Sequence, residues 1–413
     1  MPKLLLRNLG LLDPRAGALV AGRDVLVDGR FIVAVDRGLD AAGAEVIDLG
    51  GRTLMPGLID CHVHIMASHV RFGLNATGHI PASLATAHAA ARLRAMLARG
   101  FTAVRDAGGA DLGHKLAVEQ GLFAGPRLFI AGRAIGPTGG HSDARRRTDA
   151  GLGCKCANTM TFCMEIADGA DQVRGATREQ LRQGADQIKL MVSGGVASPY
   201  DPLDSRQLTL AEIRAAVEEA EAFGRYAQAH AYTPEAIARA VGQGVRTIEH
   251  GNLIDEPTAR LMAEKGAYLV ANLVAYYAMR ERAAQFGMSA EMLAKNDLVI
   301  EGGLRSLEIC KRAGVPVAYG SDLLGQLQID QSREFRLRRE VLTPIEIIRQ
   351  ATLVGAEVVR QGGKLGVIAP GACADILVVD GDPLRDLELL TGQGERLLVI
   401  MQAGRFHRNR LKA

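Results

Sequence analysis

The sequence has little excess of charge of either sign. Its 413 residues include 49 Lys and Arg and 46 Asp and Glu, which leaves a formal net charge of +3. That balance makes nucleic-acid binding an unexpected function. No uncharged run is long enough to cross a bilayer, and residues 1–7 are apolar over too short a stretch to indicate a signal peptide. We therefore expect no nucleic-acid partner and no membrane partner.

Cysteine, tryptophan and aromatic residues are also scarce. Six cysteines, none spaced as in a disulfide scaffold, are typical of a reducing compartment, so we expect a cytoplasmic protein. The absence of tryptophan and an aromatic content of 4% indicate little about function. A chain of this length can bury a large core and add a second, smaller domain.

The middle of the chain alternates strand-like runs with alanine-rich helical stretches. The runs are residues 102–105, 127–130, 188–190, 226–228, 247–248, 268–270 and 317–319, and the helical stretches include 83–99, 210–223, 234–241 and 303–313. This alternation predicts an α/β fold with a parallel sheet, and about eight such units close into a (β/α)8 TIM barrel, placed at residues 58–360. Strand and turn patterns at 3–8, 24–35, 375–379 and 397–406 predict a small β-sandwich built from both termini, residues 1–57 and 361–413.

The stretch Asp60-Cys61-His62-Val63-His64 follows an apolar run at the expected end of a strand. Side chains alternate between the two faces of a strand, so His62 and His64 project from the same face and can coordinate one divalent ion. Four further residues of ligand type each end an apolar segment: Lys189, His230, His250 and Asp322.

Taken singly, each of these four has an ordinary structural reading: a solvated strand end for the lysine, satisfied core positions for the histidines and a helix N-cap for the aspartate. Their recurrence at one position of a repeated unit favours a metal site, because the C-terminal ends of barrel strands meet at one mouth.

Several motifs together resemble those of the amidohydrolase superfamily over nearly the full length. The segment 54–64, Leu-Met-Pro-Gly-Leu-Ile-Asp-Cys-His-Val-His, is similar to its first-strand signature, and 370–375, Pro-Gly-Ala-Cys-Ala-Asp, to its tail signature. Within the superfamily the chain most resembles the imidazolonepropionase-like, prolidase-like branch of dipeptidases and carboxypeptidases. That narrower resemblance depends on residues 189–195, 230–233, 248–251 and 320–322.

The resemblance implies a binuclear metal centre. A lysine ammonium has no lone pair for a cation. The resemblance implies that Lys189 is carboxylated by CO2, giving a carbamate that bridges two metals, with Zn2+ the expected ion. On this pattern His62, His64 and Asp322 hold one metal, while His230 and His250 hold the other. A hydroxide bridging both metals attacks the amide, and Asp322 is the expected general base that later protonates the leaving nitrogen.

Two residues are candidates for contacts with the substrate. His141 lies in the glycine-rich stretch 136–143 and is expected to contact the substrate carbonyl as a catalytic and substrate-binding residue, although a flexible loop with an incidental histidine is the simpler reading. Tyr232, two residues after His230, is expected to hold a substrate carboxylate, against the alternative of an ordinary rim tyrosine. The other histidines are expected to be structural or to lie on the surface: His69, His79, His88, His114 and His407.

The segment 142–175 is long and shows little periodicity, as lids and binding loops often do. Cys154, Cys156 and Cys163 have neither the spacing nor the histidine partner of a zinc knuckle. The arginine triplet 145–147 is either a solvated run or a feature that attracts an acidic substrate.

Three function classes fit this sequence. The first is hydrolysis of the amide bond before a C-terminal amino acid, in dipeptides or N-acyl amino acids, including ochratoxin-like N-acyl phenylalanine. The second is attack on a cyclic amide or amidine, as in imidazolonepropionase or the deaminases, and the third is a barrel kept only for binding or assembly. Lys189 favours the first class, because the resemblance implies that the second works with one metal. The resemblance also implies a homo-oligomer such as an octamer.

Overall fold

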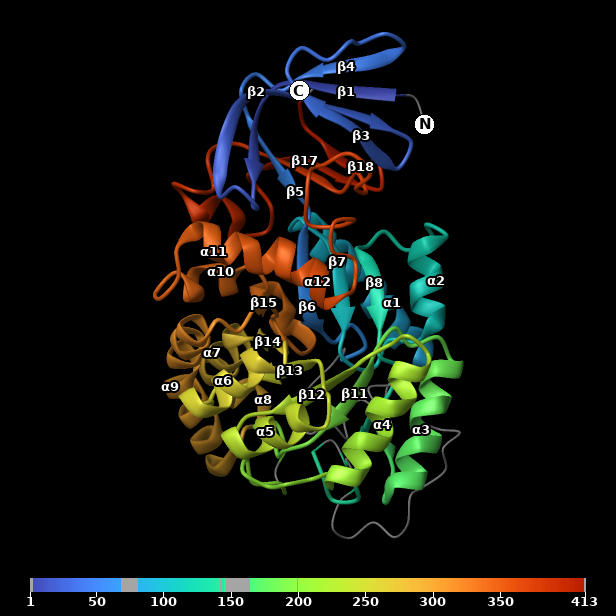
Figure 1. The fold of residues 1–413 in the computed structure, drawn as a ribbon, viewed down its shortest axis with the longest axis vertical. Helices are drawn as coiled ribbons and strands as arrows, with labels where there is room; N and C mark the ends of the chain where they lie inside the picture. Colours follow the sequence, from blue (N-terminus) through green and yellow to red (C-terminus); the bar gives the residue numbers. More distant parts are fainter. Residues whose placement is uncertain are drawn as a thin grey trace.

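The computed structural model describes residues 3–67, 81–141, 143, 145, 164–198 and 200–411. Figure 1 shows two regions: a sheet that carries both chain termini at one end, and below it a body of parallel strands surrounded by helices. The candidate site residues named above belong to the second region.

Strands from both ends of the chain form the terminal sheet. Its order is β18-β17-β16-β5-β1-β2-β3, with β4 paired to β1. The N-terminal and C-terminal parts join where β5 and β16 pair antiparallel, Pro56 opposite Ile376. As expected, both ends of the chain contribute strands to this sheet. The arrangement of these strands as a β-sandwich and the limits of the domains stay predictions. The strands are β1 (Lys3–Asp13), β2 (Ala18–Asp28), β3 (Phe31–Asp36), β4 (Ala44–Asp48), β5 (Thr53–Pro56), β16 (Ile376–Val379), β17 (Leu397–Gln402) and β18 (Arg405–Asn409).

The remaining strands form two sheets in which every neighbouring pair is parallel. One has the order β6-β7-β8 and the other β10-β9-β11-β12-β13-β14-β15. The backbone N–H groups of Ser321 and Asp322 donate to the carbonyl of His62, which ties the end of β15 to β6. The backbone N–H of Asp186, just before β11, donates to Ile130 at the end of β8. The strands are β6 (Leu58–Val63), β7 (Phe101–Asp106), β8 (Arg127–Ile130), β9 (Ala134–Gly136), β10 (Met164–Ile166), β11 (Ile188–Met191), β12 (Ala227–Ala231), β13 (Thr247–His250), β14 (Tyr268–Ala271) and β15 (Val317–Tyr319).

The parallel strands therefore form the predicted α/β fold. Backbone hydrogen bonds at two places, near His62 and near Ile130, connect the two sheets. A single closed eight-stranded barrel stays a prediction.

Helices follow most of these strands, and their first residues carry recognisable caps. Thr209 caps α4 through the backbone N–H of Glu212, and Thr233 caps α5, which has Pro234 at its first position. Only Tyr232 and Thr233 separate the last residue of β12, Ala231, from α5, so His230 lies at the C-terminal end of its strand. The helices are α1 (Ala82–Ala98), α2 (Leu112–Glu119), α3 (Ala170–Arg182), α4 (Leu210–Ala222), α5 (Pro234–Gly242), α6 (Glu256–Glu264), α7 (Leu273–Glu281), α8 (Ala283–Phe286), α9 (Ala290–Ala313), α10 (Arg333–Arg338), α11 (Pro344–Arg349) and α12 (Gly355–Val358), with the short helical turns η3 (Gly325–Asp330), η4 (Gln350–Val354) and η5 (Leu387–Leu390).

One helix is much longer than the sequence predicts. The stretch 303–313 is only the last part of α9, which begins at Ala290 with Ser289 as its N-cap. The glycines in its middle hide the periodicity, since a helix interior disfavours glycine. A side chain at Gly302 would overlap the carbonyl oxygen of Asn252. Close packing therefore explains the glycine there.

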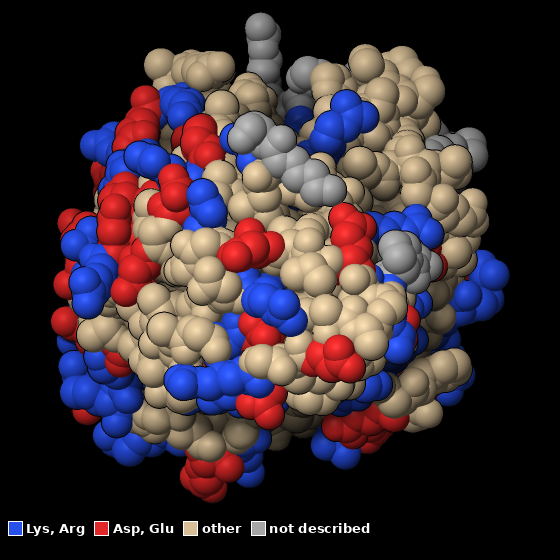
Figure 2. All heavy atoms as spheres, turned by 90° about the horizontal axis from the view of Figure 1, so that it is seen from above, with Lys and Arg blue, Asp and Glu red and all other residues tan. Residues whose placement is uncertain are grey.

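Charges of both signs are mixed on the face of the molecule that Figure 2 shows. This matches the small net charge of the sequence. Within the described ranges, no helix combines the length and apolar character that crossing a membrane requires.

Candidate metal and substrate site

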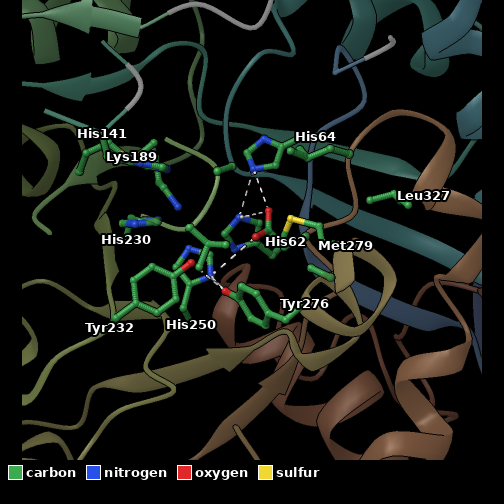
Figure 3. Close-up of a pocket in the computed structure, with 16 residues that line it drawn as sticks. His62, His64, His141, Lys189, His230, Tyr232, His250, Tyr276, Met279 and Leu327 are labelled. Atoms are coloured by element: carbon green, nitrogen blue, oxygen red, sulfur yellow. Dashed lines mark hydrogen bonds and ion pairs between the residues drawn. The ribbon is translucent and has the colours of Figure 1, made fainter. Parts of the chain in front are cut away.

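The ligand-type residues predicted from the sequence meet in one pocket, drawn in Figure 3. They come from different elements, and five of the six lie in the last residues of a parallel strand or just after it. Lys189 is the exception, because it is the second residue of β11 (Ile188–Met191) and not the strand end that the sequence predicts. The pocket lining includes all six candidates and both substrate-contact candidates: His62, His64, His141, Lys189, His230, Tyr232, His250 and Asp322.

His62, His64 and Asp322 form the tightest group. The Nε2 atoms of His62 and His64 lie 3.2 Å apart, and each lies within 3.3 Å of Asp322 Oδ1. The opposite ring nitrogens are engaged elsewhere: Nδ1 of His62 faces Glu249 at 2.7 Å, and Nδ1 of His64 faces the Gly108 carbonyl at 2.9 Å. Such bonds fix the tautomer and leave both Nε2 lone pairs directed at the pocket. This is the arrangement of a site for one divalent cation.

His230 and His250 form a second pair, with ring centroids 4.4 Å apart. His230 Nε2 donates to the carbonyl of Gly194 at 3.0 Å, and His250 Nδ1 lies 2.9 Å from Asn272 Oδ1. Burial lowers the pKa of His230 well below its ordinary value and that of His250 to about 3. Both rings are therefore neutral at physiological pH, the form in which imidazole binds a metal.

Lys189 projects from β11 into the space between His230 and the pair His62 and His64 (Figure 3). The residue is buried, and burial lowers the pKa of its amine to about 8. Among the residues that the structure describes, none forms a hydrogen bond or ion pair with its Nζ. A buried amine without such a partner, in the middle of four histidines, is costly to keep charged.

The backbone is strained at two of these residues. His250 and Asp322 have φ values of 76° and 50°, in the left-handed region that side chains other than glycine rarely adopt. Asp60 holds the second of them in place, because its carboxylate accepts hydrogen bonds from the backbone N–H and the hydroxyl of Ser321 at 3.1 and 2.6 Å. Strain of this kind persists where a surrounding network determines it, and it is typical of functional sites.

A buried ion pair beneath the pocket supports His62. Arg105 Nη2 lies 2.8 Å from both carboxylate oxygens of Glu249, and the hydroxyl of Thr247 donates to Oε1 at 2.7 Å. Burial alone would raise the pKa of Glu249, but Arg105 and His62 lower it below its ordinary value. The ionised Glu249 therefore accepts the Nδ1 proton of His62. Neither Arg105 nor Glu249 was predicted; an acidic residue next to a ligand histidine in an apolar strand is the signal that could have indicated Glu249.

The two predicted substrate contacts have close partners inside the protein. The ring of His141 stacks on His230 with centroids 4.3 Å apart, and its Nδ1 lies 3.1 Å from Asp201 Oδ2. The ring of Tyr232 stacks on His250, and its hydroxyl lies 2.9 Å from that of Tyr276. Contact of either residue with a substrate stays a prediction. Tyr276, on α7, was not predicted, because nothing in the sequence places that helix beside the pocket.

The other histidine predictions concern positions outside this pocket. His114 is buried in the first turn of α2, where it forms a capping box with Asp111. His88 lies on α1 and His407 on β18, and neither lines the pocket.

Part of the loop predictions falls outside the described residues: His69, His79, Arg146, Arg147, Cys154, Cys156 and Cys163. Arg145 is described and forms an ion pair with Asp143 at 2.5 Å. The three cysteines in the described part of the chain are free, as expected.

The sequence is similar to known hydrolases along most of its length. The pattern of the family described as "Amidohydrolase family" matches residues 53–405. Ochratoxinase of Aspergillus niger is 30% identical over 408 residues, which cover 94% of this chain and 83% of that protein. A crystal structure of an amidohydrolase is 51% identical, with a TM-score of 0.95, and covers 98% of this chain and 99% of its own. A prolidase complexed with N-methylphosphonate-L-proline is 48% identical, with a TM-score of 0.95, and covers 98% of this chain and 100% of its own.

Proposed function

Because the chain belongs to the amidohydrolase family, a hydrolytic family, we propose that it cleaves the amide bond before a C-terminal amino acid in dipeptides or N-acyl amino acids. The observation that carries this proposal is the pocket itself, in which four histidines, Asp322 and Lys189 face one another. The similarity to a prolidase bound to a phosphonate derivative of proline, and to ochratoxinase, supports the substrate class.

The donor set fits two divalent cations. Each of the four histidines has one ring nitrogen hydrogen bonded to the protein, which is how metal-binding histidines are oriented. His62, His64 and Asp322 would hold one ion and His230 and His250 the other, with zinc favoured by imidazole and carboxylate ligands. Bound there, such ions supply Lewis-acid polarisation of the amide carbonyl and acidify a water molecule.

Lys189 fits the role of a bridging ligand once it carries CO2. Its lowered pKa raises the fraction of neutral amine, and only the neutral amine has the lone pair that forms the N–C bond. The reaction with CO2 releases one proton and converts the amine into a carbamate anion. The negative charge of that anion would offset part of the charge of the bound cations, and its two oxygens are ligands that the ammonium does not offer.

Asp322 is placed to move the proton of the attacking water. Its carboxylate is partly open to the pocket and lies beside His62 and His64. As the water oxygen bonds to the amide carbon, Asp322 takes the water proton. When the C–N bond breaks, Asp322 returns that proton to the leaving nitrogen, and a carboxylic acid and an amine are formed.

His141 and Tyr232 would bind the rest of the substrate. His141 lies beside His230, where its Nε2 can donate to the carbonyl oxygen as negative charge develops there. Tyr232 and its partner Tyr276 offer the hydroxyl groups that a free α-carboxylate requires. Apolar side chains also line the pocket, which favours apolar substrate side chains: Met191, Val196, Ala275, Met279, Leu324 and Leu327.

Membership of the amidohydrolase family also supports proposals about the domain architecture, the oligomeric state and the cellular compartment. We propose a closed (β/α)8 barrel over residues 58–360 and a β-sandwich from residues 1–57 and 361–413. We also propose a homo-oligomer in the cytoplasm.

A substrate panel tests the proposed reaction. Purified, zinc-loaded protein is incubated with dipeptides and N-acyl amino acids, and with cyclic amides and amidines as the alternative class, and released amine is quantified. We expect turnover of the first group and about two metal equivalents per chain. Turnover confined to cyclic substrates with one metal equivalent would replace this proposal by the alternative.

A further inference from the structure

The loop after β11 holds two pocket histidines at once. The carbonyl of Gly194 accepts a hydrogen bond from His230 Nε2 at 3.0 Å. The next residue, Gly195, lies directly beneath the ring of His141, because a side chain there would overlap that ring. The loop therefore fixes His230 through its backbone and supports His141 through close packing.

Asp201, at the far end of this loop, fixes the orientation of His141. Asp201 Oδ2 accepts a hydrogen bond from the backbone N–H of Gly195 at 2.9 Å and faces His141 Nδ1 at 3.1 Å. Gln207 completes the arrangement, since its Nε2 donates to the same carboxylate oxygen and its Oε1 accepts from the backbone N–H of His141. Asp201 is buried, so these bonds form away from competing water. With Nδ1 engaged, the Nε2 of His141 is the ring nitrogen left for the pocket.

The loop is in turn held by a lysine that is remote in sequence. Lys295, on α9, donates from Nζ to three backbone carbonyls of the loop: Gly195 at 2.8 Å, Ser198 at 2.6 Å and Asp201 at 3.1 Å. Three carbonyl acceptors satisfy all three protons of an ammonium group. Lys295 does not line the pocket.

We propose that Asp201 and Lys295 are positioning residues for His141: Asp201 orients its ring, and Lys295 holds the loop that carries Asp201. Neither residue touches the reacting atoms. Their effect on the reaction passes through His141, and this inference rests on the proposed amide hydrolysis.

A double-mutant cycle separates positioning from simple structural support. The variants are Asp201→Ala, Lys295→Met, His141→Ala and the two double variants with His141→Ala, assayed as zinc-loaded enzymes with the dipeptide Leu-Pro. We expect each positioning variant alone to lower kcat by about 10- to 100-fold, as removal of a supporting hydrogen bond does in related settings, with KM changed little. In the His141→Ala background the same substitutions are expected to lower kcat by less than about twofold, because the residue through which they act is gone.

Two controls fix the interpretation. Lys311→Met changes another lysine of α9, whose partner Glu346 lies 2.7 Å away on the surface, and it is expected to leave kcat unchanged. Metal content and the urea midpoint are measured for every variant, and both should stay near those of the parent. Equal losses of kcat with and without His141, or loss of metal from Asp201→Ala, would overturn the proposal.

The orientation of the His141 ring provides a second readout that does not depend on activity. In crystal structures of Asp201→Ala and Lys295→Met, the ring is expected to turn away from its stacked position on His230. An unchanged ring in both variants refutes the positioning role, even if the parent hydrolyses no dipeptide. Failure of the parent on every dipeptide and N-acyl amino acid refutes instead the proposed function.

Discussion

Replacement of Lys189 by methionine should stabilise the metal-free protein while abolishing activity. Burial lowers the pKa of Lys189 from 10.5 to about 8. A pKa difference of one corresponds to about 1.4 kcal/mol, so below pH 8 the protonated amine destabilises the folded state by about 3 kcal/mol. Methionine has a similar unbranched shape and no charge, so Lys189→Met removes this penalty.

The pH dependence gives the sign of the effect. Between pH 8 and 10.5 the unfolded chain keeps a proton that the folded chain has released, so the stability of the parent rises with pH in this window. The advantage of Lys189→Met is therefore largest at pH 7 and shrinks toward pH 10.

Urea unfolding in chelator-treated, CO2-depleted buffer at pH 7 and pH 9.5, followed by circular dichroism, measures this advantage. Lys3→Met, at an exposed lysine, is the matched control, and it should leave the free energy of unfolding unchanged at both pH values. A variant no more stable than the parent at pH 7, or an advantage that does not fall with pH, would refute the reasoning.

Further variants test the assigned roles. Lys189→Ala should lose metal and activity, and short carboxylic acids should restore part of both by supplying the missing oxygens; full metal occupancy and an unchanged rate would contradict the bridging role. Asp322→Asn should fold and bind at least one metal, yet lose about 10²- to 10⁴-fold in kcat because proton transfer is impaired; a rate within tenfold of the parent would contradict the role of the base. Tyr232→Phe should mainly raise KM, since the carboxylate contact is present before and during the reaction, whereas His141→Ala should mainly lower kcat. Steady-state kinetics measure kcat and KM for both variants. A loss of kcat in Tyr232→Phe together with a raised KM in His141→Ala would contradict both assigned roles.

The residues that meet in the pocket could be recognised from the sequence because a parallel fold repeats one position. His230 and His250 lie at the ends of consecutive strands that pair in register, Ala231 opposite His250. Strand ends are recognisable from an apolar run followed by a helix cap such as Thr233. Sequence order alone therefore indicates which polar residues share an edge of the sheet.

The supporting residues could not be predicted in this way. Asp201 and Lys295 form hydrogen bonds with the backbone of the loop after β11, and Tyr276 reaches His250 from a helix whose position depends on packing. Arg105 lies within β7, where a buried arginine contradicts the usual burial preference. Such contacts join residues with no regular spacing in the chain, so only the folded structure reveals them.

The central claim is that this enzyme hydrolyses the amide before a C-terminal amino acid that carries a free carboxylate. The most direct measurement compares kcat/KM for a dipeptide such as Leu-Pro with that for the same dipeptide amidated at its C-terminus, using the zinc-loaded enzyme. The account predicts release of proline from the first substrate and little reaction with the amide, because the amide lacks the carboxylate that Tyr232 and Tyr276 are proposed to bind. Equal turnover of the two substrates would contradict it.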